Sequence, residues 1–334
     1  MKKSYYLFNP GRLSRKDNTL VFVAVDEQGT EQKAKYIPIE MVDHLYVFGS
    51  LDANSALYNF LGKNQVAVHF FDYYENYTGS FDPREYLLSG KMLIAQCQAH
   101  LQKGKRLEIA KCFLDGAAHN MLKNLKYYNN RGKDLQPIID IIENLRIPLN
   151  QSTHIDELMG IEGNIRKNYY DAFNLVINDF EMGNRTKRPP LNEVNALISF
   201  GNMMCYSECL RAIHQTQLNP TISFLHSPGE RRFSLALDLA EIFKPILVDR
   251  IIFKVLNRRE IQTSDFEQKL DRLLLKEAGK KTFVVAWENR LQETIQHRNL
   301  NRNVSYKHLM RLECYKLSKH LLGIETYKPF KAWW

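Results

Sequence analysis

Long hydrophobic runs are missing from this sequence of 334 residues. A membrane-spanning helix needs about 18 or more consecutive apolar residues, and the best candidate, Ile246–Val255, is interrupted by Asp249, Arg250 and Lys254. The sequence therefore argues against a transmembrane protein. The polar stretch that follows Lys3 is too short for the core of a signal peptide, so we expect a cytoplasmic protein.

Cysteine is also scarce. The five cysteines are an odd number and too few for a disulfide framework in a chain of this length. Cys205 and Cys209 are separated by about one helical turn, but a metal site would need further ligands at short spacing. The neighbouring side chains of Met203, Met204 and Tyr206 favour a packed helix instead.

Several familiar catalytic motifs are absent. The sequence contains no GxGxxG, no phosphate-binding loop ending in Gly-Lys-Ser or Gly-Lys-Thr, no HExxH, no GxSxG and no CxxC. These absences argue against nucleotide-driven enzymes and serine hydrolases. The proportions of hydrophobic and charged residues, 44% and 25%, are ordinary for a globular protein and exclude disordered and collagen-like classes.

Two kinds of hydrophobic pattern divide the chain. Residues 1–85 contain short runs rich in aromatic and β-branched side chains, separated by turn residues, which predicts strands. From Arg84 onward, apolar residues recur at three- and four-residue steps, which predicts helices, one of them over residues 266–276. We therefore expect an α+β protein with a small N-terminal β-sheet domain (1–85) and a larger all-α catalytic domain (86–334).

Positive charge is concentrated in the helical part. The sequence has 46 Lys and Arg against 37 Asp and Glu, a net charge of +9. Residues 1–85 carry 9 of the basic and 11 of the acidic residues, so their net charge is −2 and that of residues 86–334 is +11. This excess suits a surface that contacts DNA phosphates, although a solvated basic face would have the same composition. The candidate DNA-contacting residues are Arg185, Lys187, Arg188, Arg231, Arg232, Arg298, Arg302, Lys307 and Arg311.

Two acids lie in an otherwise apolar helical segment. Asp238 and Glu241 are three residues apart within Leu235–Phe243 and therefore face the same side of a helix. Burying carboxylates costs several kcal/mol unless a divalent cation or an arginine compensates. Arg231 and Arg232 are close enough in sequence to provide the second kind of compensation, a structural salt bridge.

Glu162 and His226 are the other candidate site residues. Glu162 shares one helical stripe with Arg166 and Tyr169, so an ordinary ion pair between positions i and i+4 also accounts for it. His226 follows the short apolar run 222–225 and is expected on a turn. Sequence spacing alone does not show that Glu162 meets His226 and the acid pair in space.

Taken together, these motifs resemble a known family. In order along the chain they are Gly160-Ile161-Glu162-Gly163, Arg188-Pro189-Pro190 with Asn195-Ala196-Leu197, Phe224-Leu225-His226, and Ser234-Leu235-Ala236-Leu237-Asp238-Leu239 followed by Glu241 and Pro245. The set is similar to the CRISPR-associated adaptation endonucleases and integrases, the Cas proteins that acquire spacers. The order and separation of several motifs make this match more specific than any one of them.

The resemblance implies both an activity and a site. It implies insertion of captured double-stranded DNA into a CRISPR array through attack of a 3′-hydroxyl on a phosphodiester. It implies that Glu162, His226 and Glu241 bind Mg²⁺ or Mn²⁺, with Asp238 as a further catalytic acid. It also implies a homodimer formed by the β domain and a small dimeric CRISPR-associated adaptation protein as partner.

The sequence departs from the family pattern at two places. Glu241 stands where some members have aspartate, which lengthens the reach of this ligand by one methylene and leaves the metal site intact. Residues 202–204 are Asn-Met-Met where many members have a tyrosine after the glycine, which argues against a role for a hydroxyl there.

Two other functions remain open on the sequence alone. A stand-alone metal-dependent nuclease acting on branched or single-stranded DNA would share the site but need no partner. A non-catalytic DNA-binding scaffold would use the same acids only in salt bridges, namely Glu162, Asp238 and Glu241 with Arg166, Arg231 and Arg232. A metal requirement for cleavage excludes the scaffold, and a strand-transfer product separates the integrase from the nuclease.

Overall fold

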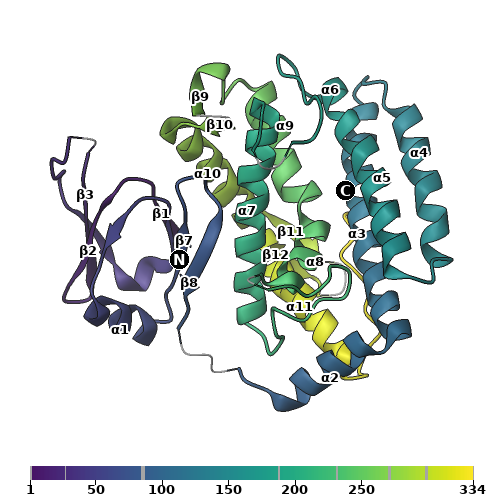
Figure 1. Cartoon of the computed structure of the whole chain (residues 1–334), viewed down its shortest axis with the longest axis horizontal. Coiled ribbons are helices and arrows are strands. Elements are labelled where there is room, and N and C mark those ends of the chain that lie inside the picture. Colours follow the sequence, from purple (N-terminus) through teal and green to yellow (C-terminus); the bar gives the residue numbers. More distant parts are fainter. Residues whose placement is uncertain are drawn as a thin grey trace. The chain divides into compact units, whose positions relative to one another are not determined.

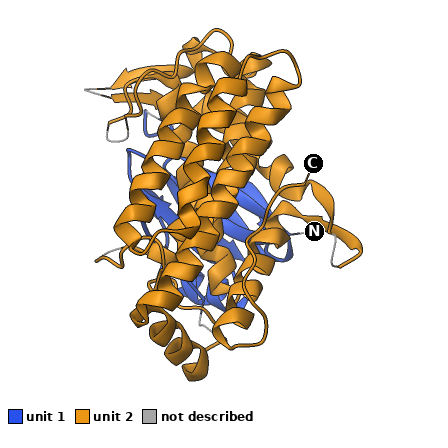
Figure 2. Cartoon of the chain, turned by 90° about the vertical axis from the view of Figure 1, so that its right-hand side faces the viewer, with its two compact units in different colours: residues 1–86 blue, residues 87–334 orange. Residues whose placement is uncertain are grey.

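The computed structural model describes residues 2–26, 28–83, 87–186, 189–230, 232–269, 272–297 and 300–333. The chain divides into two compact units, Met1–Tyr86 and Leu87–Trp334, each of which is described separately (Figures 1 and 2). Within the described ranges, no helix is both long enough and apolar enough to cross a membrane.

The described residues of the first unit form two sheets of four strands, one α-helix and a 3-10 helix, Ile39–Met41 (Figure 1). One sheet has the order β1-β5-β7-β8, in which β1 (Lys3–Leu7), β5 (Val42–Val47) and β7 (Ala67–Phe71) are parallel and β8 (Tyr77–Phe81) is antiparallel. The other sheet has the order β4-β3-β2-β6 and consists of β2 (Gly11–Lys16), β3 (Thr19–Ala24), β4 (Lys35–Pro38) and β6 (Leu51–Asp52). The strand-rich N-terminal region predicted from the sequence is confirmed.

An apolar cluster joins these elements. Leu20 and Phe22 alternate with less buried residues along β3, as expected for a strand with one buried face. Helix α1 (Ser55–Lys63) adds Leu57 and Leu61 to the same cluster. The side chain of Asn54 caps this helix by accepting a hydrogen bond from the backbone of Leu57, which explains why the helix starts at that point.

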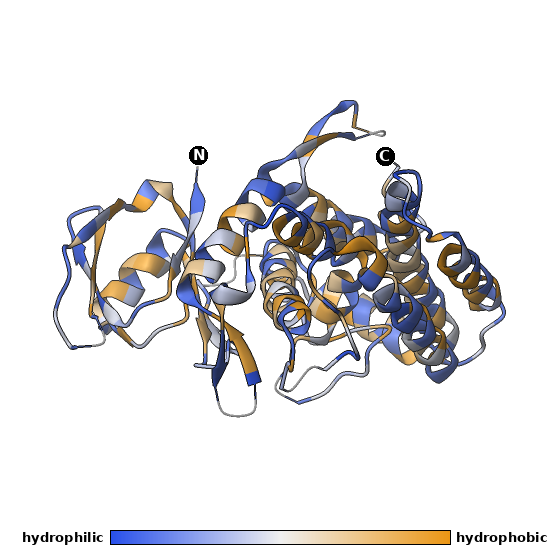
Figure 3. Cartoon of the chain, turned by 90° about the horizontal axis from the view of Figure 1, so that it is seen from above, coloured by the Kyte–Doolittle hydropathy of each residue, from blue (hydrophilic) through white to orange (hydrophobic). Residues whose placement is uncertain are grey.

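The second unit is mostly helical. Its helices are α2 (Gly90–Leu101), α3 (Lys103–Asn129), α4 (Gln136–Arg146), α5 (Ile155–Asp171), α6 (Phe173–Val176), α7 (Glu193–His214), α8 (Ser234–Phe243), α9 (Arg250–Asn257), α10 (Glu277–Gln292) and α11 (Tyr306–Leu321). A π-helical segment, Pro245–Asp249, connects α8 to α9. Figure 3 shows hydrophobic and hydrophilic residues mixed along the helices of the chain, as expected for helices with one buried face.

Helix α7 lies in the core of this unit. Its buried residues occur on all sides and include Cys205 and Cys209, as the packed-helix interpretation predicted. At Gly201 an added Cβ would lie 2.5 Å from a side-chain carbon of Val248. Glycine is therefore required here because the π-helical segment packs directly on the backbone of α7.

The prediction of an all-α second domain was wrong at two hairpins. Residues 266–276 form β9 (Phe266–Lys269) and β10 (Arg272–Leu275), and β11 (Thr294–His297) pairs with β12 (Arg302–Ser305). The apolar spacing over 266–276 fits either period, so tertiary contacts decide. In the hairpin, Phe266 pairs with Leu275, both are buried, and the backbone N–H of Leu273 donates to the carbonyl of Pro190 at 2.9 Å.

Candidate active site

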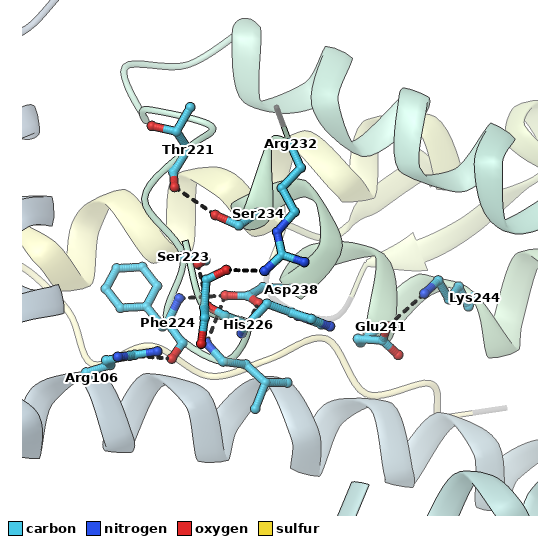
Figure 4. Close-up of polar contacts among 12 residues, drawn as sticks. Arg106, Thr221, Ser223, Phe224, His226, Arg232, Ser234, Asp238, Glu241 and Lys244 are labelled. Carbon is cyan, nitrogen blue, oxygen red and sulfur yellow. Dashed lines mark hydrogen bonds and ion pairs between the residues drawn. The ribbon is translucent and has the colours of Figure 1, made fainter. Parts of the chain in front are cut away.

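Asp238 organises the turn that carries His226. The Asp238 side chain is completely buried and accepts hydrogen bonds from the backbone N–H groups of Phe224, Leu225 and His226 at 2.7, 3.0 and 2.9 Å. The Nδ1 atom of His226 lies 2.8 Å from Oδ1 of Asp238 (Figure 4). Because the carboxylate is an acceptor, Nδ1 donates the proton of this hydrogen bond and the ring directs Nε2 away from Asp238.

Side chains from α2 and α3 hold the same turn from the other side. Nε of Arg106 donates to the carbonyl of Phe224 at 2.9 Å, and Nδ1 of His100 lies 2.6 Å from the carbonyl of Ser223 (Figure 4 shows the first contact). The amide of Gln96 donates to two more carbonyls of this loop. No sequence motif pointed to these contacts, because the partners are 118 to 126 residues apart.

The guanidinium of Arg166 joins Glu162 to Glu241. Its Nε donates to Oε1 of Glu162 at 2.5 Å, and its Nη2 donates to Oε2 of Glu241. Nζ of Lys244 donates to the other oxygen of Glu241 at 2.7 Å. The ion pair between Glu162 and Arg166 expected from their spacing on α5 is thus present, and the same arginine reaches across to α8.

Glu162 is held in its ionised form. Burial acts to raise the pKa of this carboxyl, but Arg166, Lys244 and His226 outweigh burial and leave the pKa lowered. Burial also lowers the pKa of the Lys244 ammonium group.

Asp249 is a buried acid of this region that sequence reasoning did not propose. It lies at the end of the π-helical segment and accepts a hydrogen bond from the hydroxyl of Tyr169, which in turn accepts one from Asn124 at 2.8 Å. Burial raises the pKa of Asp249 to about 7, although Arg166 and other nearby cations oppose the rise. Its only sequence signal was that it interrupts the apolar run 246–255.

The chemistry of these side chains fits a hard divalent cation. Glu162 and Glu241 contact two nitrogens of the same guanidinium, and the imidazole of His226 interacts electrostatically with Glu162. Two carboxylates and an imidazole suit Mg²⁺ or Mn²⁺. Within the part of the chain that the structure describes, however, no three His, Cys, Asp or Glu side chains already form a metal-binding group. Arg166 has to withdraw from the carboxylates before such a group can form.

The contacts of Asp238 fit a positioning residue, because its carboxylate is already used within the protein. Both of its oxygens already accept hydrogen bonds, and one of these orients His226. The salt-bridge alternative pairs the three acids with Arg166, Arg231 and Arg232, and Arg166 does pair with Glu162 and Glu241. The other two arginines belong to the loop before α8. Of these, Arg232 instead donates to the carbonyl of Ser227 at 2.6 Å, and Arg231 lies outside the described residues.

The candidate DNA-contacting residues have different surroundings. Arg185 is partly buried and donates to the Asn195 side chain at 2.9 Å, so it has a structural role whatever else it does. Arg302 is exposed on β12, Lys307 is partly buried on α11, and Arg311 on α11 contacts His308 at 3.0 Å. Lys187, Arg188 and Arg298 lie outside the described residues.

Comparison with known proteins identifies the family. Residues 5–289 match the family described as CRISPR associated protein Cas1. The CRISPR-associated endonuclease Cas1 of Fusobacterium nucleatum subsp. nucleatum is 48% identical over 337 residues, which cover 100% of this chain and 98% of that protein. The chain belongs to the Cas1 family. The resemblance found in the sequence motifs is thereby confirmed.

Solved structures agree with this assignment. A Cas1 protein from Thermotoga maritima superposes with a TM-score of 0.86 at 38% identity, over 98% of this chain and 100% of that one. A casposase bound to its integration product superposes with a TM-score of 0.87 at 21% identity, over 99% of this chain and 93% of that one. The first confirms the α+β Cas1 fold, and the second shares the fold.

Proposed function

We propose that this Cas1 protein is a divalent-metal-dependent DNA endonuclease and integrase that inserts captured double-stranded DNA into a CRISPR array. The observation that carries the proposal is that Glu162 and Glu241 meet at one largely buried guanidinium. His226, whose ring is held by Asp238, also interacts with Glu162. The Fusobacterium relative named as an endonuclease supports the nuclease activity. The fold shared with a casposase bound to an integration product supports strand transfer.

The proposed ligands are Glu162, Glu241 and Nε2 of His226, holding Mg²⁺ or Mn²⁺. When bound, the ion polarises the scissile phosphate and activates the attacking oxygen, which is a DNA 3′-hydroxyl in integration and water in hydrolysis. Asp238 fixes the tautomer and orientation of the imidazole, so Nε2 is available without rearrangement of the turn. The three residues come from two helices and one tightly bonded turn, which favours a rigid site.

The charges around the site favour phosphate binding once a divalent cation is present. The two glutamates are balanced by Arg166 and Lys244 in the arrangement that the structure shows. Even when Arg166 leaves the carboxylates it stays in the same region, so an added cation gives the site a net positive charge that attracts phosphate oxygens. Gly160 and Gly163 flank Glu162, and a Cβ added at either would meet no atom of the described residues within 4 Å. This open space leaves room for a DNA backbone beside Glu162.

We also propose the assembly that the family resemblance implies. The protein forms a homodimer mainly through residues 1–85, binds a small dimeric CRISPR-associated adaptation protein, and works in the cytoplasm. The net charge of −2 on residues 1–85 and +11 on residues 86–334 supports this division, because the basic unit is left free for DNA. Light scattering should show a dimer for the full chain and a monomer for residues 87–334. A dimer of the shorter chain would contradict the proposal.

The activity is tested by incubating the protein and its small partner with a short duplex and a supercoiled plasmid that carries a repeat. We expect joined products with Mn²⁺ and none with EDTA. Glu162→Gln is the matched control, because it changes one proposed ligand and almost no volume. Cleavage without joining would favour the stand-alone nuclease, and binding that never leads to a metal-dependent product would favour the scaffold.

A further inference from the structure

Arg166 occupies the oxygens that the proposed metal would need. It bonds to Oε1 of Glu162 and to Oε2 of Glu241, and it is the one described residue seen to contact both glutamates. The side chains of Arg166, Glu162 and Glu241 are only 14%, 18% and 7% exposed. Charge-assisted hydrogen bonds between such shielded groups are stronger than those at the surface. The guanidinium and a divalent cation therefore compete for these oxygens, and the binding free energy of the metal is reduced by the bonds to Arg166 that it must break.

We propose that Arg166 is a built-in counter-cation of the metal site, which holds the two glutamates together without metal and must move aside when a divalent cation binds. In this way Arg166 sets the affinity of the site for metal. The inference rests on the proposed function, because it assumes that Glu162 and Glu241 are metal ligands. Like charges make displacement the physical expectation, since a cation close to a guanidinium is repelled by it.

Tyr170 and Asp249 are two further groups that interact with the guanidinium. Nη1 of Arg166 is 3.5 Å from the hydroxyl of Tyr170. Asp249 is a buried acid that is hydrogen-bonded to Tyr169 and interacts electrostatically with Arg166. A buried arginine that loses one carboxylate needs another acceptor. The proposal therefore includes a movement of Arg166 from Glu241 toward Asp249.

The direct test is the binding of Mn²⁺ alone, measured by isothermal titration calorimetry on the full chain without DNA. Arg166→Gln should tighten Mn²⁺ binding by about tenfold or more, because the competing bonds are removed. Arg166→Lys keeps the charge but cannot bridge two carboxylates in the same way, so it should also tighten binding. Urea unfolding shows which variants are folded. If Arg166→Gln does not fold, the Mn²⁺ affinity of Arg166→Lys alone tests the inference.

Arg185→Gln is the matched control for charge. This variant removes a neighbouring cation whose side chain bonds to Asn195 and Tyr170 but to neither glutamate. Its affinity for Mn²⁺ should stay within about threefold of the wild type, since no hydrogen bond that competes for the oxygens of the two glutamates is removed. Equal tightening in Arg185→Gln, or no tightening in either Arg166 variant, would overturn the inference.

The role of Asp249 is tested by a double-mutant cycle. Asp249→Asn alone should weaken Mn²⁺ binding, because Arg166 loses its second acceptor. In the Arg166→Gln background the same change should have a much smaller effect, whereas independent charge effects would simply add. Additive effects of the two substitutions on the Mn²⁺ affinity would contradict the proposed movement of Arg166 toward Asp249.

Failure of this inference can be told apart from failure of the proposed site. Wild-type binding of Mn²⁺ that disappears in Glu162→Gln supports the site, and if the Arg166 variants then bind no more tightly, only the inference falls. If the wild type binds no Mn²⁺, both the metal site and the role of Arg166 are overturned.

Discussion

The Nδ1 atom of His226 lies 2.8 Å from Oδ1 of Asp238, and the same carboxylate accepts hydrogen bonds from the backbone N–H groups of residues 224, 225 and 226. One buried acid on α8 therefore fixes both the path of the turn and the direction of the imidazole. This arrangement supports a positioning role for Asp238.

Asp238→Asn should separate positioning from ligand binding. The side-chain NH₂ group of an asparagine would face the backbone N–H groups and the His226 Nδ1–H that now donate to Asp238. We therefore expect the free energy of unfolding to fall by about 2 kcal/mol or more. Strand transfer should drop by about 10- to 100-fold at a temperature where the variant is folded. Ser234→Ala is the control, because Ser234 on the same helix bonds to the Thr221 carbonyl at 2.7 Å and not to His226. Unchanged transfer in Asp238→Asn would contradict the positioning role.

Glu241→Ala should cost stability as well as activity. It leaves the largely buried Arg166 and Lys244 without one of their acceptors, and we expect a loss of about 3 to 5 kcal/mol of unfolding free energy in urea denaturation. Glu241→Gln keeps the volume and one acceptor oxygen and should cost less, although both variants should abolish strand transfer. Glu143→Ala is the control, because its 2.6 Å pair with Lys126 is exposed and should contribute about 1 kcal/mol or less. Equal losses in the two alanine variants would argue against a buried ion pair.

Asp249 should make stability depend on pH. Its pKa is raised from 3.8 to about 7 in the folded protein, so the folded state binds more protons than the unfolded state between these values. The stability contribution is therefore fully present below about pH 4 and is lost as pH rises through about 7, by at most about 4 kcal/mol. Asp249→Asn cannot titrate, so in EDTA its stability relative to the wild type should improve between pH 5 and pH 8. If Asp249→Asn instead became less stable relative to the wild type from pH 5 to pH 8, the ionised form of Asp249 would be the stabilising one.

DNA binding should depend little on sequence and steeply on salt. Replacing Arg298, Arg302, Lys307 and Arg311 together by alanine should reduce the slope of log affinity against log salt, by about 0.9 for each DNA phosphate that these side chains neutralise in the wild type. Fluorescence anisotropy with a short duplex measures this slope. Arg12→Ala is the control, because Arg12 belongs to the first unit and pairs with Asp52. An unchanged slope in the fourfold variant would place the phosphate track elsewhere, for example along Arg185, Lys187 and Arg188.

Features that depend on neighbouring residues could be predicted from the sequence. The change from strand to helix patterns rests on local periodicity. Each period can be recognised within a short window of the sequence, without knowledge of distant contacts. The candidates Glu162, His226, Asp238 and Glu241 could be named because each lies in a short motif, and an acid in an apolar helix is unusual wherever the helix packs. The hairpin at 266–275 was missed because its spacing fits two periods and its register depends on distant contacts.

The tertiary structure decided which partner each of these residues meets. The sequence could place Arg166 beside Glu162, four residues away, but its contact with Glu241 spans 75 residues. The distinction between Asp238 as a positioning residue and Glu241 as a candidate ligand, and the burial of Asp249, likewise depend on how α3, α5, α7 and α8 pack. Sequence motifs specify the chemical groups that are present, whereas their charges, donors and free lone pairs depend on neighbours that folding brings within a few ångströms.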